Sequence, residues 1–288
     1  FNDGGNASAV GRLRRNGNNL TWHDRTGAVA LQPLVGGGLF GLTLSNNGTD
    51  ATNDIDIAVG VAVDSAEGTV LRLTSALTKR LDAAWSVGTN QGGLDTGLIA
   101  NTTYHIHLIQ RTDTGVVDAL FSESATAPTM PTNYTLRRRI GSIIRAGGTI
   151  IAFTQDGDYF QVNVPLQEWY ENIPNTTANT KTLTRVPTGI NVIWHGVIQM
   201  RLAVTSNPTY IYASDLATTD TAATGPGGGG ISQVAVYQFG ANIQEGSVEV
   251  QVRVNTSAQL RIRANDITGP PTWGGTTRGW FDTRGRDA

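Results

Sequence analysis

The chain has no cysteine among its 288 residues, and charged residues are scarce. The absence of cysteine excludes disulfide bridges, thiolate metal sites and a cysteine nucleophile. Charged residues make up 15% of the sequence, against about 25% in typical domains. No stretch approaches the roughly 18 apolar residues that a membrane-spanning helix needs. These deficits argue against a charged helical protein and against membrane insertion.

The charges that are present nearly balance, at a net −2. Such a balance gives no general attraction to nucleic acid or to anionic lipid, so we expect neither as a partner. The first residues lack the apolar segment of a signal peptide, and a start at Phe1 suggests processing or a fragment. Glycine is abundant, at 35 residues, which fits many turns.

Alternating apolar and polar residues are the dominant pattern, and they predict an all-β protein. In VEVQVRVNTSAQLRIR (248–263), two alternating runs flank a short polar link, which predicts a β-hairpin. The pattern also occurs in DIDIAVGVAVD (54–64) and over 190–206, where Gly196 suggests a bulge. A short helix is expected only at 75–86. Further strands are expected at 28–33, 39–44, 69–73, 103–111, 116–122, 137–144, 149–155, 158–164, 209–213 and 233–239.

The strand spacing and the turn signals favour two antiparallel β-sandwiches of jelly-roll type, joined by Gly- and Asn-rich turns. The residue composition changes near Pro165. This proline should interrupt a strand ladder, and a polar run rich in Asn and Thr follows it. We predict an N-terminal sandwich domain over 1–164 and a C-terminal one over 165–288. The second carries a tail rich in Gly, Trp and Arg, and its segment 218–230 should be its most flexible part.

Histidine and aspartate are the residues that suggest chemistry. His105 and His107 lie two positions apart on a predicted strand and so point the same way. They would bind a metal if carboxylates joined them, but no third ligand is evident nearby, and two polar residues on a wet face are the simpler interpretation.

Carboxylates gather in two places, at 54–64 and at 156–158. Paired carboxylates can hydrolyse glycosides or bind Ca²⁺, whereas turn formation explains Asp-Gly-Asp without either. There is no GxSxG nucleophile elbow, and the Gly runs lack the GK[ST] of a phosphate loop. We expect no enzyme activity, no catalytic residue, no metal and no cofactor.

Six residues are candidate receptor or interface contacts. The basic run could face nucleic acid or the anionic sugars of a cell surface, although a solvated strand end or a subunit contact is simpler. The aromatic residues lie on Gly-rich segments and could stack on sugar rings or anchor an interface; alternatively they pack onto the second sandwich or between identical chains. Trp169 and Tyr170 should pack at the junction of the two domains and hold them together. The six are Arg137, Arg138, Arg139, Trp273, Trp280 and Phe281.

Residues 78–160 resemble a segment of the tail-fibre-like structural proteins of tailed bacteriophages and prophages. The specific pieces are GGLDTG, TYHIHLIQR, DTGVVDALFS, the SATAPTMP-NY run and RRIGSI. The ending GWFDTRGRDA (279–288) is also similar to the terminus of such proteins. About a third of the chain is covered directly.

The resemblance implies a non-enzymatic virion appendage, and because phage fibres are usually homotrimers it implies a homotrimer. The expected location is the virion, assembled in the bacterial cytoplasm and then extracellular. The expected partners are other tail or capsid proteins and a host surface glycan or protein. A tail fibre that binds the receptor is the first interpretation. A head fibre or capsid decoration protein is the alternative, and a glycan depolymerase is the second alternative.

Overall fold

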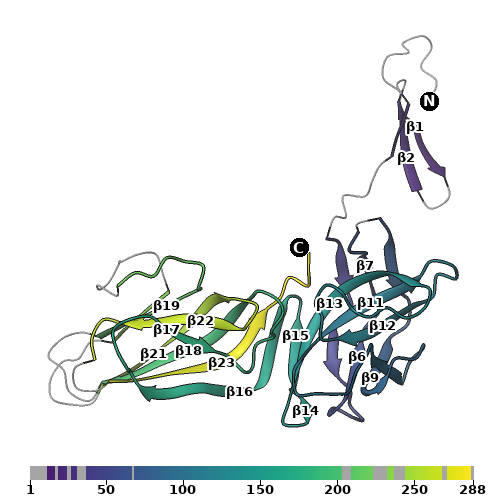
Figure 1. Cartoon of the computed structure of the whole chain (residues 1–288). Helices are drawn as coiled ribbons and strands as arrows, with labels where there is room; N and C mark the ends of the chain where they lie inside the picture. The colour runs from purple at the N-terminus through teal and green to yellow at the C-terminus, as the bar shows by residue number, and fades with distance from the viewer. Residues whose placement is uncertain are drawn as a thin grey trace.

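The protein is all-β in its computed structural model, as the alternation predicts (Figure 1). The structure describes residues 12–16, 19–24, 27–30, 37–66, 68–202, 209–222, 232–236, 244–267 and 271–286. None of these residues is helical. In chain order the strands are β1 (Arg12–Asn16), β2 (Asn19–Asp24), β3 (Gly27–Ala30), β4 (Leu39–Gly41), β5 (Leu44–Asn46), β6 (Asp54–Ile57), β7 (Gly60–Val63), β8 (Val70–Leu73), β9 (Leu77–Ala84), β10 (Gln91–Leu94), β11 (Thr103–Arg111), β12 (Val117–Ser122), β13 (Tyr134–Ala146), β14 (Thr149–Ile150), β15 (Phe153–Asp156), β16 (Tyr159–Asn172), β17 (Asn179–Thr182), β18 (Val192–Leu202), β19 (Thr209–Ser214), β20 (Ser232–Val236), β21 (Gln244–Val254), β22 (Gln259–Ala264) and β23 (Thr272–Phe281).

The C-terminal half is an eight-stranded jelly roll. One of its sheets has the order β16-β23-β18-β21 and the other has the order β17-β22-β19-β20. The first strand of the unit therefore lies beside the last, and every neighbouring pair is antiparallel. This interleaving of two Greek keys defines a jelly roll, so the predicted sandwich is confirmed here.

The core of the jelly roll is built by the alternation that the sequence displays. Along β18 the burial pattern follows period two, and Gly196 lies at a shift in the register with β23, which confirms the predicted bulge. The opposite sheet contributes apolar side chains from the inner face of β22, Leu260 and Ile262. The buried members of β18 are Val192, Trp194, Ile198, Met200 and Leu202.

The N-terminal half is a long curled sheet covered by a small one. Strands β14-β13-β11-β12-β10-β9-β6-β5-β15 follow one another in the large sheet, and β10 runs parallel to both of its neighbours. A hydrogen bond from Ile150 N of β14 to Thr52 O (2.9 Å) links one end of this sheet to the loop between β5 and β6, near its other end. The sheet β4-β7-β8 packs over β11, β12 and β13.

The two halves share one sheet, because β16 pairs with β15 at its start and with β23 along its length. Figure 1 shows the two lobes side by side, with β15 at the junction and β16 extending along the C-terminal lobe. The predicted boundary at 164/165 lies inside β16. The ladder with β23 is interrupted there, between Gln161 and Leu166, around Pro165. The division into two domains stays a prediction.

The predicted hairpin at 248–263 is wrong in its pairing. Both strands exist and both alternate, but β21 pairs with β18, whereas β22 pairs with β17 and β19. The link between them crosses from one sheet of the jelly roll to the other. Alternation reports which face of a strand is buried, and two strands facing a shared core from opposite sheets show the same alternation as a hairpin.

Three further segments differ from what the sequence suggests. The segment 54–64 is two strands rather than one, because β6 joins the large sheet and β7 joins the small one. The segment 75–86 is not helical: Leu77, Lys79 and Leu81 of β9 are buried on one face of a strand paired with β6. The tail beyond Gly269 likewise forms a strand, β23, between β16 and β18.

Candidate functional site

The basic run at 137–139 is placed by an irregularity in β13. Opposite β11 the register shifts, so that His107 faces Arg139 while Ile106 faces Gly141. The extra residue, Ile140, makes a β-bulge, which bends the strand locally. Arg138 and Arg139, which precede the bulge, are both buried, although they are neighbours in a strand.

Arg139 forms a bidentate ion pair with Asp282 of the C-terminal segment. The two N–O distances are 2.6 Å and 2.8 Å, and the Asp282 side chain is 2% exposed. Asp282 also accepts a hydrogen bond from the backbone N–H of Arg284 at 2.7 Å. A buried charge pair of this geometry is held by charge-assisted hydrogen bonds. It ties the segment after β23 to the N-terminal half.

The neighbouring arginines strengthen the same attachment. Arg138 donates to the backbone carbonyl of Gly285 at 2.7 Å. Arg284 lies 3.7 Å from Asp158, which also forms an ion pair with Arg286. The expectation of a solvated strand end is therefore wrong for Arg138 and Arg139, because both are enclosed by the returning C-terminal segment. Their role toward a receptor stays a prediction.

The two predicted wet-face histidines are buried. His105 is 0% exposed and its Nδ1 lies 2.8 Å from Ser142 Oγ; His107 is 1% exposed and its Nε2 lies 3.0 Å from the carbonyl of Ser124. Burial lowers the pKa of His105 to about 3 and that of His107 to about 4, with a further lowering from the charge of Arg139. Both imidazoles are therefore neutral at pH 7.

A cavity of about 310 Å³ opens beside these groups, and we call it the arginine pocket. Its walls come from β11, β13, the loop after β12, the loop before β18 and the C-terminal segment. The loop before β18 brings Gly189 and Ile190 to the N-terminal half, although more than forty residues separate it from β13. The side chains that characterise the pocket are His107, Thr126, Arg137, Arg138, Arg139 and Ile190.

Two of the three candidate aromatic residues are buried within the chain itself. Trp273 is 0% exposed and donates from Nε1 to Glu171 at 3.1 Å, while Trp280 stacks on Phe160 at 5.3 Å. This is the alternative in which they pack onto the second sandwich. Neither ring presents a face to solvent, so we do not place them in a contact surface.

Phe281 is half-buried and belongs to an aromatic cluster on the outer face of the jelly roll. Its ring lies 4.7 Å from that of Tyr159, whose hydroxyl is 2.8 Å from His195 Nδ1. The other imidazole nitrogen lies 2.7 Å from Glu249. The Tyr159 ring fits because Gly279 has no side chain; a Cβ there would meet it at 2.9 Å. The alternation along β18 places His195 on the outer face. Its partners, Tyr159 and Glu249, come from distant segments that the local pattern does not reveal.

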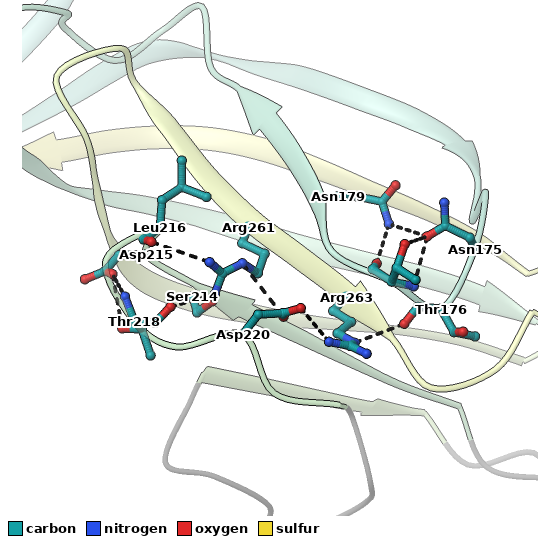
Figure 2. A network of polar contacts seen from close by, with 11 residues as sticks. Asn175, Thr176, Asn179, Ser214, Asp215, Leu216, Thr218, Asp220, Arg261 and Arg263 are labelled. Carbon is teal, nitrogen blue, oxygen red and sulfur yellow. Dashed lines mark hydrogen bonds and ion pairs between the residues drawn. The ribbon is translucent and has the colours of Figure 1, made fainter.

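A polar network covers the outer face of the second jelly-roll sheet, as Figure 2 shows. Arg261 and Arg263 project from alternate positions of β22 toward Asp220, at 3.8 Å and 2.6 Å. Arg261 also donates to the carbonyl of Thr218 at 2.8 Å, and Arg263 to that of Thr176 at 3.0 Å. These contacts fasten the first part of the predicted flexible segment to the sheet. Residues 223–230 of that segment lie outside the described residues.

The aspartates singled out in the sequence serve turns and ion pairs. Asp64 accepts hydrogen bonds from the backbone N–H groups of Gly68 (2.8 Å) and Thr69 (2.6 Å). Asp54 has a pKa raised by burial and by the nearby carboxylate of Asp50. Within the described part of the chain, no group of three or more acidic, histidine or cysteine side chains could hold a metal ion. Nor does that part contain a helix that is long and apolar enough to span a membrane.

No protein-family model matches the chain, and a search of curated proteins gives no match. One solved structure to which the chain shows similarity is titled "Structure of infectious bursal disease virus Gx strain". The identity is 11% and the TM-score is 0.20, over 83% of this chain and 69% of that one. A TM-score this low supports no argument about fold or function.

Proposed function

We propose that the protein is a non-enzymatic structural component of a phage virion, located at the distal end of a tail fibre, where it binds the host surface. The observation that carries the proposal is the resemblance of residues 78–160 to tail-fibre-like proteins. In the structure this stretch forms β9 to β15 and the start of β16, which together make most of the N-terminal sheet.

The fold and the site are compatible with this role. Jelly rolls occur in viral capsid proteins and in lectins, which is an analogy at the level of the fold. The arginine pocket and the Phe281 cluster are concave or aromatic features of the kind that sugar ligands use. In a homotrimer, three copies of a weak site would bind a cell surface with avidity.

The first test is antibody labelling of intact virions, viewed by negative-stain electron microscopy. The proposal expects label at the tail tip or baseplate, and expects virions that lack the domain to lose adsorption to the host. Label over the head would replace it with the head-fibre or decoration alternative. Unchanged adsorption without the domain would remove receptor binding from the proposal.

The absence of enzyme activity has its own test. Purified protein spotted on a lawn of the host should leave no halo. A halo would show that surface polysaccharide is degraded, and the depolymerase alternative would then take precedence.

A further inference from the structure

We propose that the arginine pocket is a binding site for a sugar acid, in which Arg137 binds the carboxylate of the ligand and His107 accepts a hydrogen bond from an adjacent hydroxyl. The inference deepens the proposed function, since it names an acidic glycan of the host surface as the receptor chemistry. Nothing in the resemblance assigns this pocket.

The size of the cavity fits one sugar unit. Its volume of about 310 Å³ lies at the lower end of the ~300–1,000 Å³ that is usual for small-molecule sites. Polar groups form one side, and Ala125 and Ile190 supply apolar surface. Such a mixture suits a pyranose ring, which has polar edges and an apolar face.

The charge in the pocket is not fully compensated. Arg139 is neutralised by its bidentate contact with Asp282. Arg137, in contrast, is half-buried, and no carboxylate of the described residues lies within ion-pair distance of it. Its one described side-chain hydrogen bond runs from Nη2 to the carbonyl of Thr126 at 2.8 Å. The planar guanidinium therefore keeps donors that match a carboxylate.

The second, independent observation is a buried acceptor with no partner. The Ser124 carbonyl can only accept, so His107 Nε2 carries the proton and Nδ1 carries a lone pair. Nδ1 is buried and has no hydrogen-bond partner, and the imidazole lines the pocket. A buried polar atom left unpaired is costly, so this acceptor points to a ligand that supplies a donor.

The uncompensated guanidinium of Arg137 and the unpaired acceptor of His107 together select the class of ligand. A carboxylate alone satisfies the arginine but leaves Nδ1 unpaired, and inorganic phosphate, which keeps one or two protons near pH 7, has no apolar face to pack on Ala125 and Ile190. A sugar acid presents a carboxylate and hydroxyl groups at fixed separation on one ring. The overall negative charge of the chain also disfavours an extended polyanion such as nucleic acid.

The test is isothermal titration calorimetry of the full chain with D-glucuronate and D-galacturonate, with glucose and inorganic phosphate as comparison ligands. At least one uronate should bind, glucose should bind at least tenfold more weakly, and phosphate should not compete. Arg137→Met should weaken uronate binding by about tenfold or more, the usual cost of losing a hydrogen bond to a charged group. Arg145→Met is the matched control, because Arg145 lies on the same strand but contacts Asn101 and Gly148 instead.

Several outcomes would overturn the site. These are absence of uronate binding, equal binding by Arg137→Met and the unaltered chain, or competition by phosphate at equal concentration, which would indicate a general anion site. Failure of uronate binding can be distinguished from failure of the proposed location on the virion. Uronate binding together with label on the head would keep the pocket and remove the tail fibre; label at the tail tip without uronate binding would do the reverse.

Discussion

Buried histidines next to a cation make the stability of the protein depend on pH. His105 and His107 are neutral in the folded chain, and their pKa values of about 3 and about 4 lie below the unfolded value of 6.5. Between pH 6.5 and the folded-state pKa values, the unfolded chain binds more protons than the folded one. The free energy of unfolding therefore falls as the pH falls through this range. Above pH 6.5 this contribution is constant.

We expect the free energy of unfolding to lose about 1.4 kcal/mol per pH unit for each such histidine below pH 6.5. Urea denaturation at pH 7.0, 6.0 and 5.0 measures it. Because carboxylates also titrate toward the lower end, His107→Gln is the reference: its curve should fall less steeply than that of the unaltered chain. Parallel curves would show that the pKa of His107 is the same in the folded and unfolded chains.

The ion pair between Arg139 and Asp282 should be among the most sensitive single contacts. Asp282→Asn leaves a buried guanidinium without its counter-charge, and breaking a buried pair in this way costs about 3–5 kcal/mol. Asp113→Asn, which disrupts the exposed pair with Arg111, should change the denaturation midpoint little. Equal effects of the two substitutions would contradict the burial of Asp282.

At the scale of single elements, glycines in β23 make room for aromatic rings of the adjacent strand β16. A Cβ on Gly275 would lie 2.0 Å from the ring of Trp169, on the adjacent strand β16. Glycine usually weakens a strand, and here the close approach of an aromatic ring explains its presence.

Gly275→Ala should therefore destabilise the jelly roll by about 1–3 kcal/mol through overpacking. Tryptophan fluorescence should shift as well, because Trp169 must move. Gly48→Ala is the control, since a Cβ at Gly48 meets nothing within 4 Å. Chemical denaturation followed by fluorescence compares the two, and a neutral Gly275→Ala would mean that β16 and β23 lie further apart than described.

Strands could be predicted from the sequence far better than their partners. The bounds of β11 are those expected from alternation, and β19 ends one residue later than expected. The pairing of β22 was missed because hydrogen-bond partners in a jelly roll come from distant segments, which period-two patterns do not encode. No strand was predicted at β23, because its glycines hide the alternation.

The candidate site was predictable only in part, for the same reason. The arginine run was singled out by its charge, but the burial of Arg138 and Arg139 depends on a C-terminal segment that returns from β23. The two histidines were placed on a wet face because polar residues normally lie there. The arrival of the loop at Gly189 and Ile190 has no signal in the local sequence.

At the scale of the whole molecule, the shared sheet should make the two halves unfold together. Differential scanning calorimetry should show one transition, with calorimetric and van't Hoff enthalpies in agreement. Two resolved transitions would show that β16 couples the halves weakly, and would support independent domains at 1–164 and 165–288.

The proposed homotrimer is also a property at this scale. Several large apolar side chains are exposed in the single chain, including Phe40 (79%), Leu98 (89%) and Val164 (73%). Sedimentation equilibrium should give three times the chain mass of 30.5 kDa. A monomer at micromolar concentration would remove the trimer from the proposal.

The return of the chain after β23 has a mechanical consequence. The polypeptide crosses the junction between the lobes twice, outward along β16 and back through β23, and its end is clamped by Asp282 to Arg139. A pull that separates the lobes is therefore resisted by the covalent chain at β16 and by the non-covalent attachment of the C-terminal segment. In the proposed role the protein would tether a particle to a moving cell, and the double crossing would resist the resulting drag without any disulfide.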